Sequence, residues 1–172
     1  LSETIVNRHA RQRLADELRR RKGKRPPHDR ILIVCEGSKT EPNYFNEIRI
    51  LKRAQSAHIS IMPSGYGTEP CQIVEFALNK FLETKEYERV YAVFDRDIHN
   101  TYNEALQWIS ALDKKKRSDE RAAVRFFAIP SVPSFEFWLL LHYENIQWLL
   151  HRDAVLQRLK QHIQGYEKGA KG

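Results

Sequence analysis

Acidic residues follow two of the apolar segments of this 172-residue chain. Glu36 comes directly after the apolar run 31–35, and Asp95 and Asp97 come directly after the run 89–94. Side chains two positions apart on an extended backbone point the same way, so Asp95 and Asp97 are expected to face one point. Carboxylates gathered at one point repel each other unless a cation lies between them, and Mg²⁺ prefers such hard oxygen ligands. The pattern predicts a site for Mg²⁺ (or Mn²⁺) held by Glu36, Asp95 and Asp97.

The segments around these acids alternate between strand and helix patterns. Continuous apolar runs rich in β-branched residues predict strands at 31–35, 59–62, 89–94 and 122–129. Helical spacing of apolar residues predicts helices at about 40–55, 70–84, 101–112 and 135–143, with a further amphipathic stretch at about 152–163. Pro130 and Pro133 are expected to bracket a turn. The alternation predicts an α/β, Rossmann-like domain with a mainly parallel sheet and helices on both faces.

Ligand sites of such sheets lie outside the carboxyl ends of the strands. The predicted strands place Glu36, Asp95 and Asp97 at that one edge. Taken alone, Glu36 is an ordinary turn residue, and the Asp95–Asp97 pair is an ordinary polar loop. Their shared position favours a metal site, at which a bound ion can polarise a phosphodiester and activate an attacking water.

Positive charge is concentrated at the start of the chain. Residues 1–30 hold ten Lys or Arg and four acidic residues, which is +6 of the net charge of +7. The segment 1–27, which includes Arg19, Arg20 and Arg21, is therefore predicted to be a basic arm, followed by one domain over 28–172. A basic arm on a nearly neutral body is typical of proteins that bind nucleic acid. A solvated tail that serves solubility is the alternative.

Composition narrows the class of protein. No apolar run approaches the roughly 18 residues that a membrane span requires, and residues 1–30 contain no apolar stretch typical of a signal peptide. Cys35 and Cys71 lack the spacing of metal ligands and are expected to be reduced packing residues. We therefore expect a cytoplasmic protein with no membrane contact.

Three segments resemble the motifs of RloB-like proteins. They are residues 31–45 (ILIVCEGSKTEPNYF), residues 93–97 (VFDRD) and residues 131–144 (SVPSFEFWLLLHYE). The resemblance covers about 28–168 and implies a Toprim-like fold, in which the acids carried over to Glu36, Asp95 and Asp97 hold the metal and act in catalysis. It also implies a role in phage defence, often beside an ATPase partner. Ser38 departs from the pattern, because many relatives are expected to carry an acidic residue there.

Further residues are candidates with open alternatives. Glu136 lies in an otherwise apolar helix, where a buried carboxylate is costly unless it is paired or bound to metal, so a catalytic role competes with a structural salt bridge. Lys168 resembles a terminal Tyr-x-Lys element of these proteins and is a candidate for stabilising charge in the transition state. Lys39 and Arg96 flank the carboxylates and are candidates for binding phosphate, with ion pairs to those carboxylates as the alternative.

Weaker candidates remain. Glu41 begins a helix, where a negative charge is favourable in any case. His99 is interpreted as a surface histidine, and Phe137, Trp138 and Trp148 are expected in the core rather than as base-stacking platforms.

Two functions follow from these features. The first is a Mg²⁺-dependent nuclease that cleaves RNA or DNA. The second is a non-catalytic nucleic-acid-binding subunit that docks to a partner of a defence system, for which the basic arm suffices. A primase or topoisomerase is disfavoured, because the sequence has no zinc ribbon and no companion domain that places a nucleophilic tyrosine.

Overall fold

The computed structural model describes residues 29–54, 58–96 and 100–167. Its elements, in chain order, are β1 (Ile31–Cys35), α2 (Thr40–Leu51), β2 (Ile59–Pro63), α3 (Pro70–Thr84), β3 (Arg89–Asp95), α4 (Tyr102–Leu112), β4 (Arg125–Ser131), α5 (Phe135–Leu140) and α6 (Arg152–His162). The predicted arm 1–27 and the predicted site residues Asp97 and Lys168 lie outside the described residues, as does His99. The predicted order of strands and helices is confirmed.

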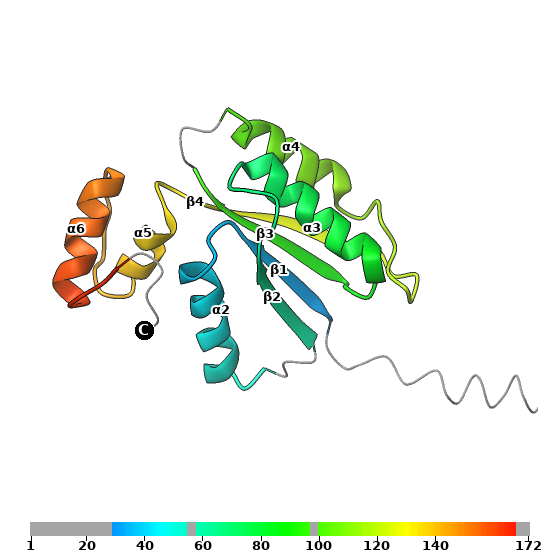
Figure 1. Ribbon diagram of the computed structural model, residues 1–172, viewed down its shortest axis with the longest axis horizontal. Helices are drawn as coiled ribbons and strands as arrows, with labels where there is room; N and C mark the ends of the chain where they lie inside the picture. Colours follow the sequence, from blue (N-terminus) through cyan, green and yellow to red (C-terminus); the bar gives the residue numbers. More distant parts are fainter. Residues whose placement is uncertain (1–28, 55–57, 97–99, 168–172) are drawn as a thin grey trace, which may run out of the picture.

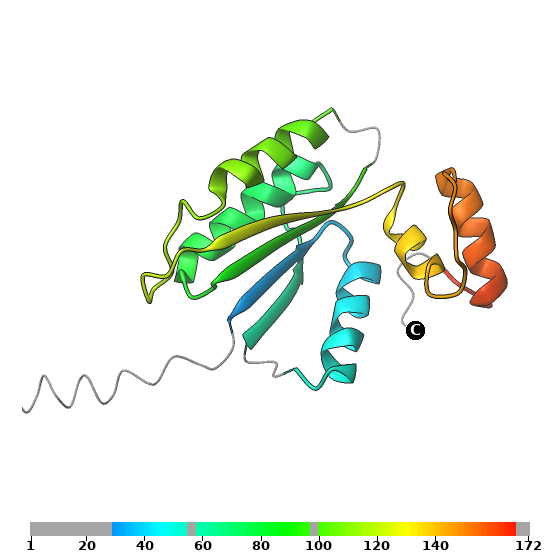
Figure 2. The same ribbon diagram turned by 180° about the vertical axis from the view of Figure 1, so that it is seen from behind.

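The four strands form one parallel sheet in the order β2-β1-β3-β4. Helices α3 and α4 lie on one face of the sheet and α2 on the other, while α5 and α6 lie beyond the carboxyl ends of the strands (Figures 1 and 2). The predicted Rossmann-like α/β architecture is therefore confirmed. The chain leaves β1 toward α2 on one face and leaves β3 toward α4 on the other, so the topological switch point falls between these neighbouring strands.

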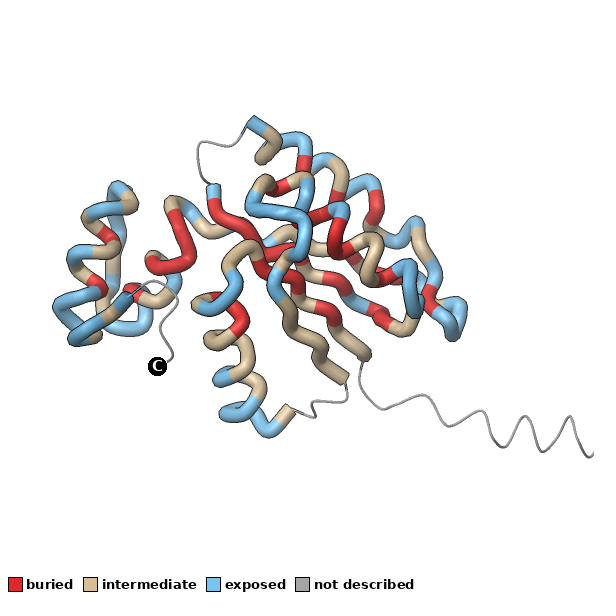
Figure 3. The backbone as a smooth tube through the Cα atoms, viewed as in Figure 1, coloured by how far each residue is buried: buried red, intermediate tan, exposed pale blue. Residues whose placement is uncertain are grey.

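The alternation of side chains along the strands divides the core into two parts. Leu32, Val34 and Phe94 pack with the inner sides of α3 and α4 in the main cluster, whereas Cys35 and Val93 pack on the opposite face. Figure 3 shows the buried residues gathered along the central strands and the sheet-facing side of α3. Asp95 has the same parity as Val93 on β3 and therefore belongs to the α2 face.

Helix α3 has the bounds that the sequence predicts. Pro70 occupies its first turn, where the missing N–H costs nothing, and Glu69 and Gln72 form a capping box. The predicted inward face is buried: Ile73, Phe76, Ala77 and Phe81.

The fourth strand differs from its prediction. Residues 122–124 fold back on 114–118 instead, with Val124 N donating to Lys116 O at 3.1 Å and Ser118 N donating to Ala122 O at 3.0 Å. Strand β4 then runs through Pro130, so the predicted turn at Pro130 is wrong. Proline is tolerated there because β4 is an edge strand, and an edge position does not need its N–H for a ladder bond.

Two helices are shorter than predicted. Helix α2 ends at Leu51, followed by Arg53 at a φ of 51°, and α5 ends at Leu140. Along α2, Tyr44 and Phe45 pack against the sheet, but Leu51 is 76% exposed. No helix in the described ranges is long and apolar enough to cross a membrane.

Candidate functional site

Glu36 and Asp95 lie side by side at the carboxyl edge of the sheet, at the switch point. Strands β1 and β3 are paired with Cys35 opposite Val93, and Glu36 N continues the ladder by donating to Val93 O at 2.9 Å. The Glu36 side chain turns toward β3, where its Oε2 accepts a hydrogen bond from Asp95 N at 2.8 Å. This bond fixes the Glu36 carboxylate against the backbone of Asp95, whose own side chain is buried.

The third predicted metal ligand, Asp97, lies outside the described residues. Within residues 29–54, 58–96 and 100–167, no three His, Cys, Asp or Glu side chains are grouped to hold a metal ion. The described part of the predicted triad is therefore the pair Glu36 and Asp95.

A third carboxylate, Glu41, is buried in the first turn of α2 and lies against Gly37. A Cβ on residue 37 would collide with the Glu41 carboxylate, so glycine is needed in the segment that leads from β1 into α2. Burial, assisted by the negative charge of Glu41, raises the pKa of the Cys35 thiol well above its ordinary value. Cys35 is therefore a neutral packing residue beside this site, and both cysteines are reduced as predicted.

Glu136 lies in the first turn of α5 and is also buried, and Ser134 Oγ donates to its Oε2 at 2.7 Å. Burial and the nearby charge of Glu136 raise the pKa of the Tyr166 hydroxyl to about 12. The charge of Glu41 acts on the same hydroxyl. Tyr166, after α6, therefore lies near the carboxylates of α2 and α5. Its buried hydroxyl has no hydrogen-bond partner among the described residues and remains protonated at neutral pH.

The cationic residues differ in their relation to the carboxylates. Arg152, at the start of α6, places Nη2 at 4.0 Å from Asp95 Oδ2. Lys39 is exposed at the position before α2. Arg96 is exposed too, but its guanidinium carbon lies 5.5 Å from the centroid of the Tyr102 ring, on the α4 side. Lys168, Arg19, Arg20 and Arg21 lie outside the described residues.

Sequence reasoning missed several residues of this site. Glu41 was left undecided, because an acid in a first helical turn is common. Ser134, Tyr166 and Arg152 were not singled out for their side chains. Ser134 had a usable signal, since serine is a preferred residue at the position before a helix. Arg152 had none, because only the packing of α6 on α5 brings it to β3.

The expected burial of two tryptophans is wrong. Trp138 and Trp148 are 51% and 56% exposed. Helix α5 has only six residues and buries its inner side, including Leu140, so Trp138 falls on the outer side. Phe137, by contrast, packs in the α5–α6 cluster as expected.

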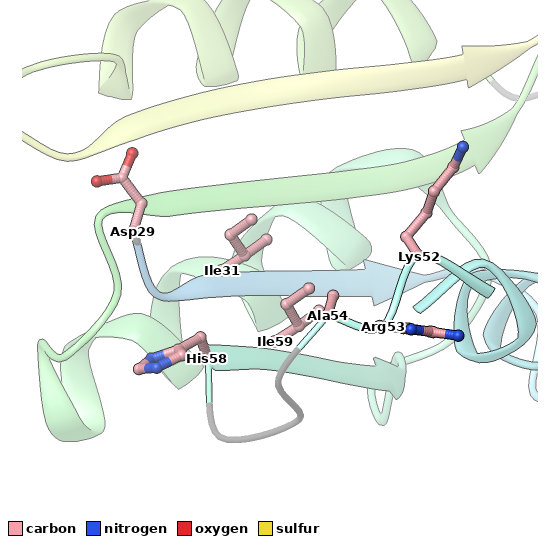
Figure 4. Close-up of a pocket in the computed structure, with 7 residues that line it drawn as sticks. All are labelled: Asp29, Ile31, Lys52, Arg53, Ala54, His58 and Ile59. Atoms are coloured by element: carbon pink, nitrogen blue, oxygen red, sulfur yellow. The ribbon is translucent and has the colours of Figure 1, made fainter. Parts of the chain in front are cut away.

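A pocket of about 390 Å³ lies at the opposite, amino end of the sheet, beside β1 and β2. Figure 4 shows the polar ends of Asp29, Lys52, Arg53 and His58 pointing in different directions, away from the apolar Ile31 and Ile59. Binding sites for small molecules combine an apolar lining with convergent polar groups. This pocket lacks that convergence, so the carboxyl edge is the better candidate.

Comparison with known proteins identifies the family. The model of the family described as RloB-like protein matches residues 31–172, which include the four strands and all three motif segments. No curated protein and no solved structure matches the chain. Because the family model covers well over half of its residues, the chain belongs to the RloB-like protein family.

Proposed function

We propose that this protein is a metal-dependent nuclease of Toprim type that cleaves RNA or DNA at the carboxyl edge of its sheet. The observation that carries the proposal is the contact between Glu36 and Asp95 at the switch point, with two more buried carboxylates nearby. Four acids from separate elements serve no packing purpose that apolar residues would not serve better. Binding of a cation and a phosphate substrate would explain why these acids are present.

The donor set fits Mg²⁺ or Mn²⁺. Glu36 and Asp95 offer only carboxylate oxygens, and the neighbouring Ser134 and Glu136 add hydroxyl and further carboxylate oxygens. Glu36 and Asp95, together with Asp97, are the residues proposed to hold the ion. When bound, the ion would polarise the phosphodiester and lower the pKa of an attacking water.

The remaining residues receive roles from their positions. Glu136 is fixed by Ser134 and is proposed to accept a proton or to add a ligand. Tyr166 is protonated at neutral pH, so its hydroxyl can donate to a carboxylate and hold it in place. Arg152 and Lys39, with Lys168 and Arg96, are proposed to contact phosphate oxygens.

The family supplies the proposed setting. RloB-like membership supports a cytoplasmic role in antiviral defence of the abortive-infection kind, with an ATPase as partner. The basic arm 1–27 is proposed to add phosphate contacts that are independent of sequence.

The experiment is a cleavage assay on tRNA, single-stranded DNA and duplex DNA, with Mg²⁺ and with a chelator. Parent protein should cut at least one substrate in Mg²⁺ only, and Asp95→Asn should not. Asp113→Asn is the matched control, because Asp113 is ion-paired with Arg125 far from this edge. No cleavage by the parent on any substrate, or equal cleavage by Asp95→Asn, would reject the proposal.

A non-catalytic nucleic-acid-binding subunit is the second candidate. The concentration of +6 of the net charge in residues 1–30 favours it, because that feature needs no active site. Such a protein would bind the same substrates with equal affinity in parent and Asp95→Asn and would cut none of them.

A further inference from the structure

The outer side of α5 carries an exposed tryptophan, Trp138, whose indole ring is held by a hydrogen bond at its N–H edge. Trp138 Nε1 donates a hydrogen bond to the hydroxyl of Tyr44 on α2, and that hydroxyl is also hydrogen-bonded to His142 Nε2 at 3.0 Å. Tyr44 in turn packs edge-on against Phe135 with ring centroids 5.4 Å apart. The indole is therefore held in one orientation by its N–H, although 51% of the residue remains exposed.

Other exposed aromatic residues of the α5–α6 unit have their faces occupied. His162 stacks on Tyr143 at 5.1 Å with an interplanar angle of 14°, and the guanidinium of Arg158 lies over Trp148 at 5.6 Å. Trp138 has only an edge contact with His142, at 6.4 Å between centroids. As far as the described residues extend, neither a stacked ring nor a cation lies over the Trp138 ring.

The position of Trp138 relates it to the carboxylates. It lies two residues after Glu136, and its anchor Tyr44 lies three residues after Glu41. At 100° per residue, Trp138 and Glu136 project from different sides of α5, so the ring stands outside the carboxylate cluster by about one helix width, roughly 10 Å. A group that stacks there therefore belongs to the neighbour of the reacting nucleotide rather than to the nucleotide itself.

We propose that Trp138, oriented by Tyr44 and His142, is a stacking platform for an unpaired base next to the phosphate that is cleaved. The inference rests on the proposed function and makes single-stranded nucleic acid, RNA or DNA, its substrate class. An exposed aromatic face stacks with any unpaired base, whereas the bases of a duplex already cover each other's faces. The +6 that residues 1–30 contribute to the net charge of +7 favours nucleic acid over a protein surface as the occupant.

The test is binding without cleavage, by fluorescence polarisation in chelator with labelled single-stranded RNA, single-stranded DNA and the duplexes of the same sequence. Trp138→Leu keeps apolar bulk but removes the aromatic face, and it should weaken single-strand affinity about tenfold while duplex affinity stays within about twofold. Trp138→Phe should retain most of the affinity. Trp148→Leu is the matched control, and it should bind single strands like the parent.

Each outcome decides the inference separately from the proposed function. Equal single-strand affinity in Trp138→Leu and parent, or an equal loss in Trp148→Leu, overturns it. A Trp138→Leu that binds normally but changes oligomeric state in sedimentation also overturns it, in favour of a protein contact. If the parent cuts nothing in Mg²⁺ but Trp138→Leu, unlike Trp148→Leu, loses single-strand affinity, the stacking platform is supported and the nuclease is rejected. The melting temperatures of Trp138→Leu and Trp138→Phe, both compared with the parent, show that the comparison is between folded proteins.

Discussion

At the amino ends of the strands, acidic side chains are matched with arginines. Arg30 donates to Glu88 at 2.8 Å and to Asp119 at 2.6 Å, and further pairs join Arg89 to Asp29 at 2.7 Å and Arg125 to Asp113 at 2.8 Å. Hydrogen bonds to Glu88 and then to Asp119 raise the pKa of Arg30 above its ordinary value. These acids stabilise the fold as members of ion pairs.

At the carboxyl ends, acids are gathered with each other. Glu36 is bonded to the backbone of Asp95, Glu136 to a serine hydroxyl, and the charges of Glu41 and Glu136 both act on Tyr166. Arg152 at this edge stands 4.0 Å from Asp95, compared with 2.6 to 2.8 Å for the pairs at the amino ends. The difference teaches that one sheet uses its acids in two ways: in ion pairs at the amino ends, and near one another at the carboxyl edge, where we propose that a cation and phosphate bind.

Removal of one carboxylate charge at each end of the sheet should have opposite effects on cleavage and on melting temperature. This is the largest difference we expect. Asp95→Asn should lower Mg²⁺-dependent cleavage by at least about a hundredfold, since even outer partners of metal sites are worth about 10–100-fold. Its melting temperature without metal should hold or rise, because repulsion among the carboxylates is relieved. Asp113→Asn should do the reverse: it should cleave like the parent and melt a few degrees lower, because Arg125 loses its partner. Cleavage rates and melting curves are measured for both variants. A variant that loses both cleavage and thermal stability would contradict the proposed difference between the two ends of the sheet.

Removal of Arg30, at the amino ends of the strands, should have the largest effect on stability. Arg30→Met leaves Glu88, which is 6% exposed, as a buried charge without its guanidinium, at a cost of about 3 kcal/mol. For a chain of this size, that corresponds to a fall in melting temperature of roughly 6–12 °C, measured by circular dichroism. Cleavage per folded molecule should not change.

The control for this prediction is the double variant Arg30→Met with Glu88→Leu. Replacement of a buried ion pair by apolar residues is often neutral, so the double variant should recover most of the lost stability. A double variant as unstable as Arg30→Met would show that the ion pair is not the source of the effect.

The close contact between Gly37 and Glu41 at the carboxyl edge should be detectable by adding a methyl group at residue 37. Gly37→Ala places a Cβ against the Glu41 carboxylate and should cost about 2 kcal/mol, a typical penalty for overpacking. In a Glu41→Ala background the same substitution should cost less than half as much, because the colliding atoms are gone. Urea unfolding of the parent, the two single variants and the double variant measures this coupling, and additive costs would contradict the assigned contact.

The sequence predicts the parts of the molecule that follow from local pattern. The order of elements and the bounds of α3 could be predicted because buried strands are continuous apolar runs, while Pro70 and the capping box mark a helix start. The contact between Glu36 and Asp95 follows from two acids at the ends of parallel strands that turn out to be neighbours.

Other features depend on packing that no local pattern contains. Tyr166 lies near Glu136 and Glu41 only because α6 folds back on α5, and the same packing brings Arg152 to Asp95. Pro130 can continue a strand only because β4 is at the edge of the sheet. Trp138 is of a residue type that is usually buried, but it lies on a helix too short to be enclosed on every side.

The smallest expected effect concerns Asp119, the exposed partner of Arg30. The hydrogen bond from Arg30 holds the pKa of Asp119 below its ordinary value, so the charged carboxylate favours the folded state. Stability from this pair is therefore present above the unfolded pKa, about 3.9, and lost as the pH falls through the lower folded value. Asp119→Asn should reduce the free energy of unfolding at pH 7 by about 1 kcal/mol or less, because the side chain is 44% exposed and solvent screens the pair. Urea unfolding at pH 7 and at about pH 3 should show the difference from the parent shrinking at the lower pH. A difference that persists or grows in acid would mean that Asp119 contributes through packing rather than through its charge.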